Sequence, residues 1–338
     1  MVVLSFFLSA VLDNLTCTIV MVSLLRKLVP DRNERLWFAS FVVIAANAGG
    51  AWSPIGDVTT TMLWIGKKVT TEGLITDLFL PSVVCTVLPV FIATRLPIFQ
   101  GSLELGPGDK GLSRKTEQLL SSRTMLFLGV GMLIFVPVFK AITHLPPYVG
   151  MMFSMSVVWL VSEYIHPEED FTRERRAQYS ARHALSRIEL SSILFFLGIL
   201  AAVAALESVV AAYHEDGKAV GLLMLLAEEL SRAVPNLDIV VIVIGFLSAI
   251  IDNVPMVAAI MGMYPMEQFP VDSKLWQFVA YSAGTGGSML IIGSAAGVAA
   301  MGMERIDFIW YMRKISWLAI IGFLAGALVF IFWYPLLH

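Results

Sequence analysis

The chain has 338 residues, of which 57% are hydrophobic and 14% are charged, and its mean hydropathy is +0.79. Soluble domains carry roughly 25% charged residues, so this composition excludes an ordinary soluble protein and indicates an integral membrane protein. The net charge of -3 gives no reason to expect a nucleic-acid partner. Cys17 and Cys85 are isolated in apolar segments without metal-like or cofactor-like spacing, and we expect them only to pack.

Several apolar runs approach or exceed the roughly 20 residues that cross a bilayer as a helix. They are Pro81 to Thr94 with its flanks, Met125 to Phe139, Tyr148 to Tyr164, Leu190 to Tyr213 and Ile315 to Trp333. None of them alternates apolar and polar residues as the strands of a membrane barrel do. We therefore expect an all-α polytopic membrane protein.

Two phrases occur twice in the chain. Phe7 to Leu15 reads FLSAVLDNL and Phe246 to Val254 reads FLSAIIDNV, and each is followed at nearly the same distance by a second shared phrase, at Phe41 to Gly56 and at Phe278 to Gly293. Two repeated pairs predict two structurally related halves.

The first half alternates apolar runs with breaks. Met1 to Leu25 carries an Asp-Asn pair in its middle, and the helix that starts at Leu36 is interrupted over Asn47 to Asp57 by three glycines and a proline. Glycine costs about 1 kcal/mol and proline about 3 kcal/mol inside a helix, so we expect unwinding there. Val58 to Ile65 then continues the helix, and a polar loop follows from Lys67 to Asp77.

We expect the first repeat at 1–100 and a cytoplasmic connector at 101–123, which is rich in charges and contains Gly-Pro-Gly. The second repeat, 124–338, is predicted to contain scaffold helices at 124–213, an amphipathic interfacial helix at 219–234, a hairpin at 238–264, a broken helix at 275–302 and a last helix at 315–335. Since the first repeat has no counterpart of the helices at 124–213, we expect its amino-terminal scaffold helices to be missing.

Basic residues orient the chain, because cytoplasmic loops are enriched in Lys and Arg. If both Asp-Asn segments are re-entrant hairpins and every other long run crosses once, 17 of the 23 basic residues fall on one side. This asymmetry supports two hairpins that open to opposite sides, and hence an inverted repeat of the kind found in many secondary transporters.

Three aspartates lie inside apolar runs with no neighbouring Lys or Arg: Asp13, Asp57 and Asp252. An ionised aspartate near the bilayer centre costs at least about 2.5 kcal/mol on insertion scales. One explanation is that the carboxylates cap short helices at the hairpin tips. The other is that they face each other at the midplane and bind a cation.

The breaks are rich in oxygen ligands, which hard cations prefer, and contain no His or Cys, which disfavours zinc and copper. Ser53 and Ser294 also lie there. The predicted sodium/proton site consists of Asp13, Asn14, Thr16, Asn47, Asp57, Thr59, Thr60, Asp252, Asn253, Thr285 and Ser288.

A carboxylate removed from water is harder to ionise, so it can hold a proton when no metal is bound and release it when sodium arrives. Asp57 corresponds to Ser294 in the second repeat, and Asn47 to Gly284. We therefore expect the first half to supply more of the ion ligands. Glu189 and Glu207 are weaker candidates, the latter for a proton path.

An enzyme is not expected, because the chain has no nucleophile-base pair, metal cluster or cofactor loop. The paired glycines at 49–50 and 286–287 are not followed by a Lys at P-loop spacing.

Four stretches carry a resemblance: SAVLDNLT at 9–16, NAGGAWSPIGDVTT at 47–60, SAIIDNVP at 248–255 and SAGTGGSMLIIGSAAG at 282–297. At these residues the chain resembles the NhaD-type sodium/proton antiporters of the ion transporter superfamily. The resemblance implies two hairpins and two broken helices in a transport domain that moves like an elevator beside a dimerising scaffold. It further implies efflux of sodium or lithium in exchange for protons in a homodimer, with Asp13, Asn47, Asp57, Thr59 and Asp252 on family site positions.

Dicarboxylate carriers, ArsB-type arsenite exporters and NhaB-type antiporters share this architecture. Dicarboxylate carriers resemble one another in having neutral hairpin tips, whereas Asp here would repel a dianion, and neutral arsenite needs no intramembrane carboxylates. An arsenite, antimonite or organic-anion carrier is thus the alternative function. We expect the protein in a bacterial inner (plasma) membrane, with no cofactor besides the transported ions.

Overall fold

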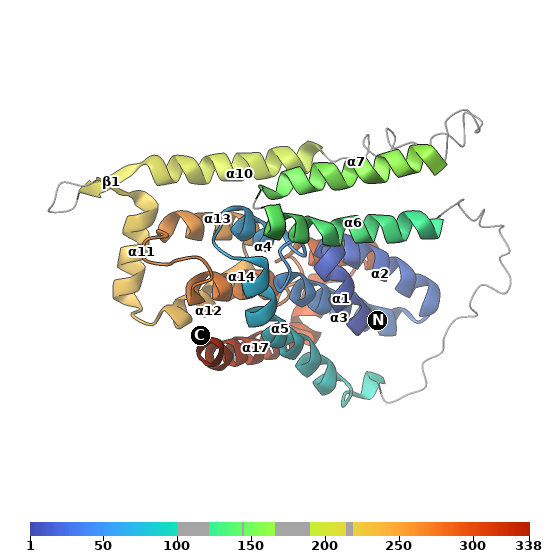
Figure 1. Ribbon diagram of the computed structural model, residues 1–338. Coiled ribbons are helices and arrows are strands. Elements are labelled where there is room, and N and C mark those ends of the chain that lie inside the picture. The colour runs from blue at the N-terminus through green and yellow to red at the C-terminus, as the bar shows by residue number, and fades with distance from the viewer. Residues whose placement is uncertain (100–121, 144, 166–189, 214–218) are drawn as a thin grey trace. The chain divides into compact units, whose positions relative to one another are not determined.

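The computed structural model describes residues 1–99, 122–143, 145–165, 190–213 and 219–338 (Figure 1). Its elements are mostly helices, which agrees with a polytopic membrane protein. A short antiparallel ladder pairs Val210–Tyr213 (β1) with Ala219–Gly221 (β2), so the all-α prediction is wrong in this detail. The expected connector at 101–123 lies outside the described residues except for 122 and 123.

The chain forms two compact units, Met1–Gly108 with Gly198–His338, and Asp109–Leu197. The second unit contains Ser122–Thr143 (α6) and Pro147–Ile165 (α7), which pack antiparallel. Ser154 Oγ donates to the Met132 carbonyl at 2.9 Å, and the Phe153 ring lies against those of Phe135 and Phe139. The predicted repeat boundaries at 1–100 and 124–338 stay a prediction.

In the first unit, the amino-terminal part consists of Val2–Leu12 (α1), Asn14–Leu28 (α2), Arg32–Ala51 (α3), Val58–Ile65 (α4), Thr71–Ala93 (α5) and a short turn, Pro97–Phe99 (η1). Helix α5 begins earlier than expected, because Thr70 Oγ1 accepts a hydrogen bond from Gly73 N at 3.0 Å and caps it. The prediction of a polar loop from Lys67 to Asp77 is therefore wrong for the residues after Thr70.

The carboxyl-terminal part contains Leu222–Ala233 (α11), Leu237–Ser248 (α12), Asn253–Met263 (α13), Lys274–Gly286 (α14), Ala295–Glu304 (α15), Phe308–Lys314 (α16) and Ser316–Leu337 (α17). Upstream of these, Leu190–Ser208 (α10) ends before Tyr213, the expected end of that helix. The prediction there is wrong because residues 210–213 pair with β2 instead.

Each Asp-Asn segment is broken at the expected place. Asp13 separates α1 from α2 with a φ of 69°, and residues 249–252 separate α12 from α13. At 1.5 Å per residue, α1, α12 and α13, of 11, 12 and 11 residues, are too short to cross a bilayer alone.

Helix α3 continues through Asn47 and two glycines and unwinds only after Ala51, somewhat later than expected, and α14 likewise continues to Gly286. Glycine is required at these helical positions because the backbone of a neighbouring helix occupies the space that a side chain would fill. A Cβ on Gly49 would lie 2.1 Å from the Phe6 carbonyl oxygen, and one on Gly286 would lie 2.3 Å from that of Gly245. Helix packing thus outweighs the low helix propensity of glycine.

These contacts repeat between the halves. When the repeated phrases are aligned, Gly49 corresponds to Gly286, and Phe6, one residue before the first phrase, corresponds to Gly245. Similarly, Ser9 Oγ donates to the Ala46 carbonyl at 2.5 Å in α1–α3 packing, and the equivalent Ser248 donates to the Ala283 carbonyl at 3.0 Å in α12–α14 packing. The sequence repeat is therefore also a repeat of helix packing, while its inversion across the membrane and the re-entrant course of the hairpins stay predictions.

Four helices among the described residues are long and apolar enough to span a bilayer: Thr71–Ala93, Arg123–Thr143, Tyr148–Ile165 and Ser316–Leu337. Helices α5 and α17 pack closely through glycine, since a Cβ on Gly322 would lie 2.4 Å from the Cys85 carbonyl oxygen. Together with the composition, these helices show an integral membrane protein.

Candidate ion site

Asp57 is a buried carboxylate at the start of α4, with 4% of its surface exposed. Its Oδ1 accepts hydrogen bonds from Val58 N and from Asn14 Nδ2, both at 2.9 Å. Its Oδ2 accepts from Thr59 Oγ1 and, at 3.3 Å, from Asn253 Nδ2. Since Asn14 and Asn253 follow the two repeated aspartates, both Asp-Asn segments converge on one carboxylate.

Asn47 on α3 extends this network into the second broken helix. Its Nδ2 donates to Ser288 Oγ at 2.9 Å and to Ser294 Oγ at 2.8 Å, while its Oδ1 accepts from Asn14 Nδ2 at 3.0 Å. Asn14 therefore bridges Asn47 and Asp57. All these side chains are buried.

The structure thus brings together six of the residues predicted from the sequence and adds a seventh, Ser294. We call these seven residues the polar cluster: Asn14, Asn47, Asp57, Thr59, Asn253, Ser288 and Ser294. The signal for Ser294 was its equivalence to Asp57 in the repeat, and both residues cap the helix that follows their break.

The other two aspartates lie at helix tips. Asp13 is half-buried and caps α2, accepting from Thr16 N at 2.7 Å and from the exposed Thr16 Oγ1 at 2.9 Å. Asp252 is exposed and caps α13, accepting from Val254 N at 3.1 Å. Each directly precedes an asparagine that donates to Asp57. The structure therefore places one of the three carboxylates inside the polar cluster and two at its margin.

Two predicted hydroxyls, and that of Ser53 in the first break, are buried but engaged with backbone. Thr60 Oγ1 donates to the Asp57 carbonyl at 2.9 Å, Thr285 Oγ1 to the Tyr281 carbonyl at 2.6 Å and Ser53 Oγ to the Ala10 carbonyl at 2.6 Å. Glu189, and the side chain of Glu207 on α10, lie outside the described part of the chain.

The polar cluster is chemically suited to a small hard cation. It holds one carboxylate, three amides and three hydroxyls, and both amides and hydroxyls carry acceptor oxygens. In the part of the chain that the structure describes, His, Cys, Asp and Glu nowhere gather in threes as a transition-metal site would require. Gly284, the counterpart of Asn47, adds no side chain beside Asp57; its Cβ would lie 3.7 Å from Oδ2.

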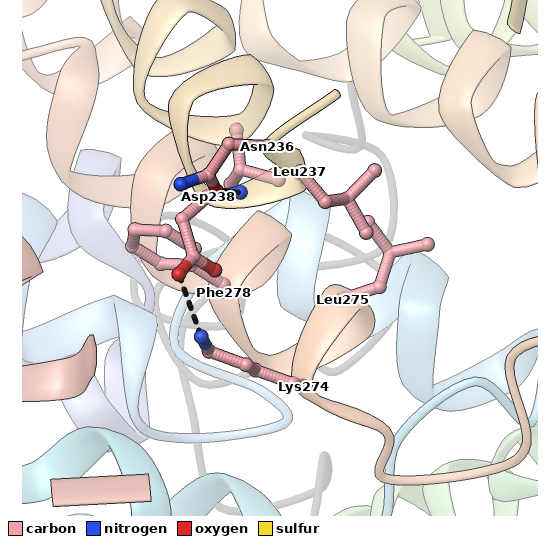
Figure 2. Close-up of a pocket in the computed structure, with 7 residues that line it drawn as sticks. Asn236, Leu237, Asp238, Lys274, Leu275 and Phe278 are labelled. Carbon is pink, nitrogen blue, oxygen red and sulfur yellow. Dashed lines mark hydrogen bonds and ion pairs between the residues drawn. The ribbon is translucent and has the colours of Figure 1, made fainter. Parts of the chain in front are cut away.

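A separate pocket of about 200 Å³ lies at the starts of α12 and α14 (Figure 2). It is lined by Asn236, Leu237, Asp238, Val241, Lys274, Leu275 and Phe278. Lys274 Nζ and Asp238 Oδ2 form an ion pair of 2.7 Å across it. None of the polar cluster lines this pocket.

Comparison with known proteins shows the family to which the chain belongs. The CitMHS family, described as citrate transporter, matches residues 1–279. "Sodium/proton antiporter 1" and "Sodium/proton antiporter 2" of Arabidopsis thaliana are 50% and 45% identical to this chain over 95% and 97% of it. "Na(+)/H(+) antiporter NhaD" of Vibrio parahaemolyticus is 29% identical over 94% of it.

The chain belongs to the CitMHS family and is an NhaD-type transporter. It spans about half the length of the first Arabidopsis relative, 53%, and 74% and 76% of the other two. The resemblance to NhaD-type transporters that the repeated phrases carry is thereby confirmed, and the family and the names of the relatives indicate a transporter.

Proposed function

We propose that this NhaD-type chain exchanges sodium or lithium for protons, and that the two ions compete for Asp57. The observation that carries the proposal is that one buried carboxylate receives side chains from both repeats: Asn14 from the first and Asn253 from the second. Three relatives bear the names of sodium/proton antiporters, which supports the same cargo here.

Competition follows from charge. A carboxylate buried away from water is stable only when it is neutralised or well hydrogen-bonded. A proton neutralises Asp57 as well as a sodium ion does, but both cannot occupy it together. Alternate binding of the two ions therefore yields antiport without a separate proton channel.

The two asparagines would act as substitutes for the cation. Their amide nitrogens face Asp57 in the structure, so they satisfy the ionised carboxylate in the step between release of one ion and binding of the other. Rotation of each amide presents its oxygen instead. Sodium would then be held by Asp57 Oδ atoms, by the oxygens of Asn14 and Asn253, and by Thr59 Oγ1.

Asp13 and Asp252, the two carboxylates at the margin of the polar cluster, would attract the sodium ion. Asp13 and Asp252 already accept hydrogen bonds from helix termini, so they need no sodium for stability. Their negative charges beside Asp57 raise the local cation concentration. We propose that sodium reaches the polar cluster past these two tips.

The movement we propose is an elevator-like displacement of the broken helices and Asp-Asn segments as one body, in a homodimer. Irregular backbone at membrane depth is tolerated only where it lines a cavity or is buried. The dense hydrogen bonding of the two breaks to each other supports a body that keeps its internal contacts while it moves.

The expected bacterial plasma membrane stays a prediction, since the relatives with 50% and 45% identity are plant proteins.

An organic-anion or arsenite carrier is less well supported. The side chains that reach Asp57 within the described residues are amides and a hydroxyl, with no Lys or Arg to pair with a tricarboxylate. Arsenite is neutral, so its transport would not require a buried carboxylate such as Asp57. The family description alone does not decide the cargo.

The test is proton movement in everted vesicles containing the protein, after addition of sodium, lithium, potassium, citrate or arsenite in separate arms. We expect proton release from the vesicle lumen with sodium or lithium and none above the protein-free background with citrate or arsenite. Citrate- or arsenite-dependent transport without a sodium response would overturn the proposal.

A further inference from the structure

Glu304 is a buried carboxylate at the carboxyl end of α15, the helix whose other end is capped by Ser294 of the polar cluster. Its side chain is 2% exposed, and its two oxygens accept from two arginines: Oε1 from Arg26 Nε and Oε2 from Arg35 Nε, each at 2.7 Å. Arg26 lies near the end of α2 and Arg35 near the start of α3. This triad therefore ties the second repeat to the first.

The same three helices carry residues of the polar cluster at their other ends. Helix α2 begins at Asn14, α3 contains Asn47 twelve residues after Arg35, and α15 is capped by Ser294. At 1.5 Å per residue the triad and the polar cluster are about 15 to 18 Å apart along each helix. The three helices also pack pairwise, α2 on α3, α2 on α15 and α3 on α15.

The position of each of these helices therefore sets the hydrogen bonds at the ion site. Asn14 on α2 reaches Asn47 on α3, and Asn47 reaches Ser294 at the start of α15. A shift of one helix along its axis at the triad would be transmitted to the polar cluster, because packed helices move as rigid rods more readily than they deform.

Burial makes the triad a strong constraint. A carboxylate that loses its partner while it stays buried is far less stable than a paired one. Arg35 is additionally fixed, because its Nη1 donates to the carbonyls of Val29 at 3.0 Å and Pro30 at 3.2 Å in the turn between α2 and α3. Movement at Glu304 must therefore displace this turn as well.

We propose that Glu304 is a positioning residue for the ion site: through Arg26 and Arg35 it holds α2, α3 and α15 in the register that aligns Asn14, Asn47 and Ser294. The inference rests on the proposed function, since it concerns affinity for sodium. It makes Glu304 a determinant of sodium binding although it touches no ion.

The experiment measures sodium-dependent proton exchange in everted vesicles for wild type, Glu304→Gln and the charge-swapped double variant Arg35→Glu/Glu304→Arg. Residues that orient metal ligands typically cost about tenfold or more in affinity when changed, so we expect the KM for sodium to rise about tenfold in Glu304→Gln. The maximal rate should stay within about twofold, because the ion ligands themselves are unchanged. The double variant retains one acidic and two basic groups and should recover most of the affinity.

The matched control is Glu229→Gln, which removes an exposed pair with Arg232 inside one helix and should leave both kinetic constants unchanged. An unchanged KM in a folded Glu304→Gln protein, or a double variant no better than the single one, would overturn the proposal. If Glu304→Gln does not accumulate, Arg26→Gln replaces it: a raised KM supports the proposal and a wild-type KM overturns it. Absence of exchange in wild type would instead refute the proposed function.

Discussion

Asn253 of the second repeat donates its side-chain amide to Asp57 of the first repeat, with 3.3 Å between Nδ2 and Oδ2. The two halves of the chain thus meet at one carboxylate. Its partner on the other oxygen, Asn14, holds the equivalent position in the first repeat. The site is therefore built from a duplicated feature that serves a group present in only one copy.

Replacing Asn253 with Ala should weaken sodium binding. A hydrogen bond to a charged group contributes about 1.5 to 3 kcal/mol, so we expect the KM for sodium to rise at least about tenfold. The measurement is exchange at graded sodium concentrations. Asn33→Ala, at an exposed asparagine of α3, is the control and should behave as wild type; equal KM values in the two variants would contradict the role given to Asn253.

Competition at one carboxylate fixes the sign of the pH dependence. Below the pH at which the site loses its proton, each further unit of acidification should raise the KM for sodium about tenfold, because protons occupy a growing share of the carboxylates. Above that pH the KM should level off. Initial rates at saturating sodium should not show this tenfold dependence. A KM independent of pH over the active range would indicate separate sites.

Substitutions of Asp13 and Asp252 can separate the effect of their negative charge from the effect of their helix capping. Asn caps a helix about as well as Asp, whereas Ala loses about 1 kcal/mol. Asp13→Asn and Asp252→Asn should therefore keep stability and exchange but raise the KM for sodium a few-fold, and the Ala variants should in addition unfold at lower temperature. Complete loss of exchange in Asp252→Asn would show that this exposed carboxylate is itself an ion ligand.

The sequence predicted the repeat, the positions of the four breaks and most of the polar cluster, because each depends on local features: an Asp-Asn pair, glycines or a proline inside apolar runs. It did not predict which aspartate is buried. Asp13, Asp57 and Asp252 all lie in similar apolar surroundings along the chain, and only packing distinguishes the half-buried cap, the buried carboxylate and the exposed cap.

Long-range partners were likewise hidden. Glu304 and Arg26 are 278 residues apart, and the sequence around Glu304 reads only as the end of an apolar helix. Similarly, the sequence predicts Thr60 and Thr285 as ion ligands but does not show that both hydroxyls donate to nearby backbone carbonyls. Side-chain direction decides such cases.

The close approach of helices at Gly286 predicts that two glycine-to-alanine variants differ in stability. Gly286→Ala would place a Cβ 2.3 Å from the Gly245 carbonyl oxygen, whereas a Cβ on Gly302 meets nothing within 4 Å. Overpacking costs about 1 to 3 kcal/mol, so Gly286→Ala should lower the unfolding temperature. Gly302→Ala should leave it unchanged or raise it, since Ala favours helix. Thermal unfolding in detergent measures both, and equal temperatures would contradict the observed packing.

The most direct test of the account is sodium-dependent proton movement in everted vesicles containing Asp57→Asn, beside Asp31→Asn as the control. Asp31 is an exposed helix cap that accepts from Glu34 N at 2.8 Å, a role that Asn fills equally well. We predict that Asp57→Asn abolishes exchange in a protein that still folds and that Asp31→Asn matches wild type. Wild-type exchange in Asp57→Asn would contradict the claim that sodium and protons share this carboxylate.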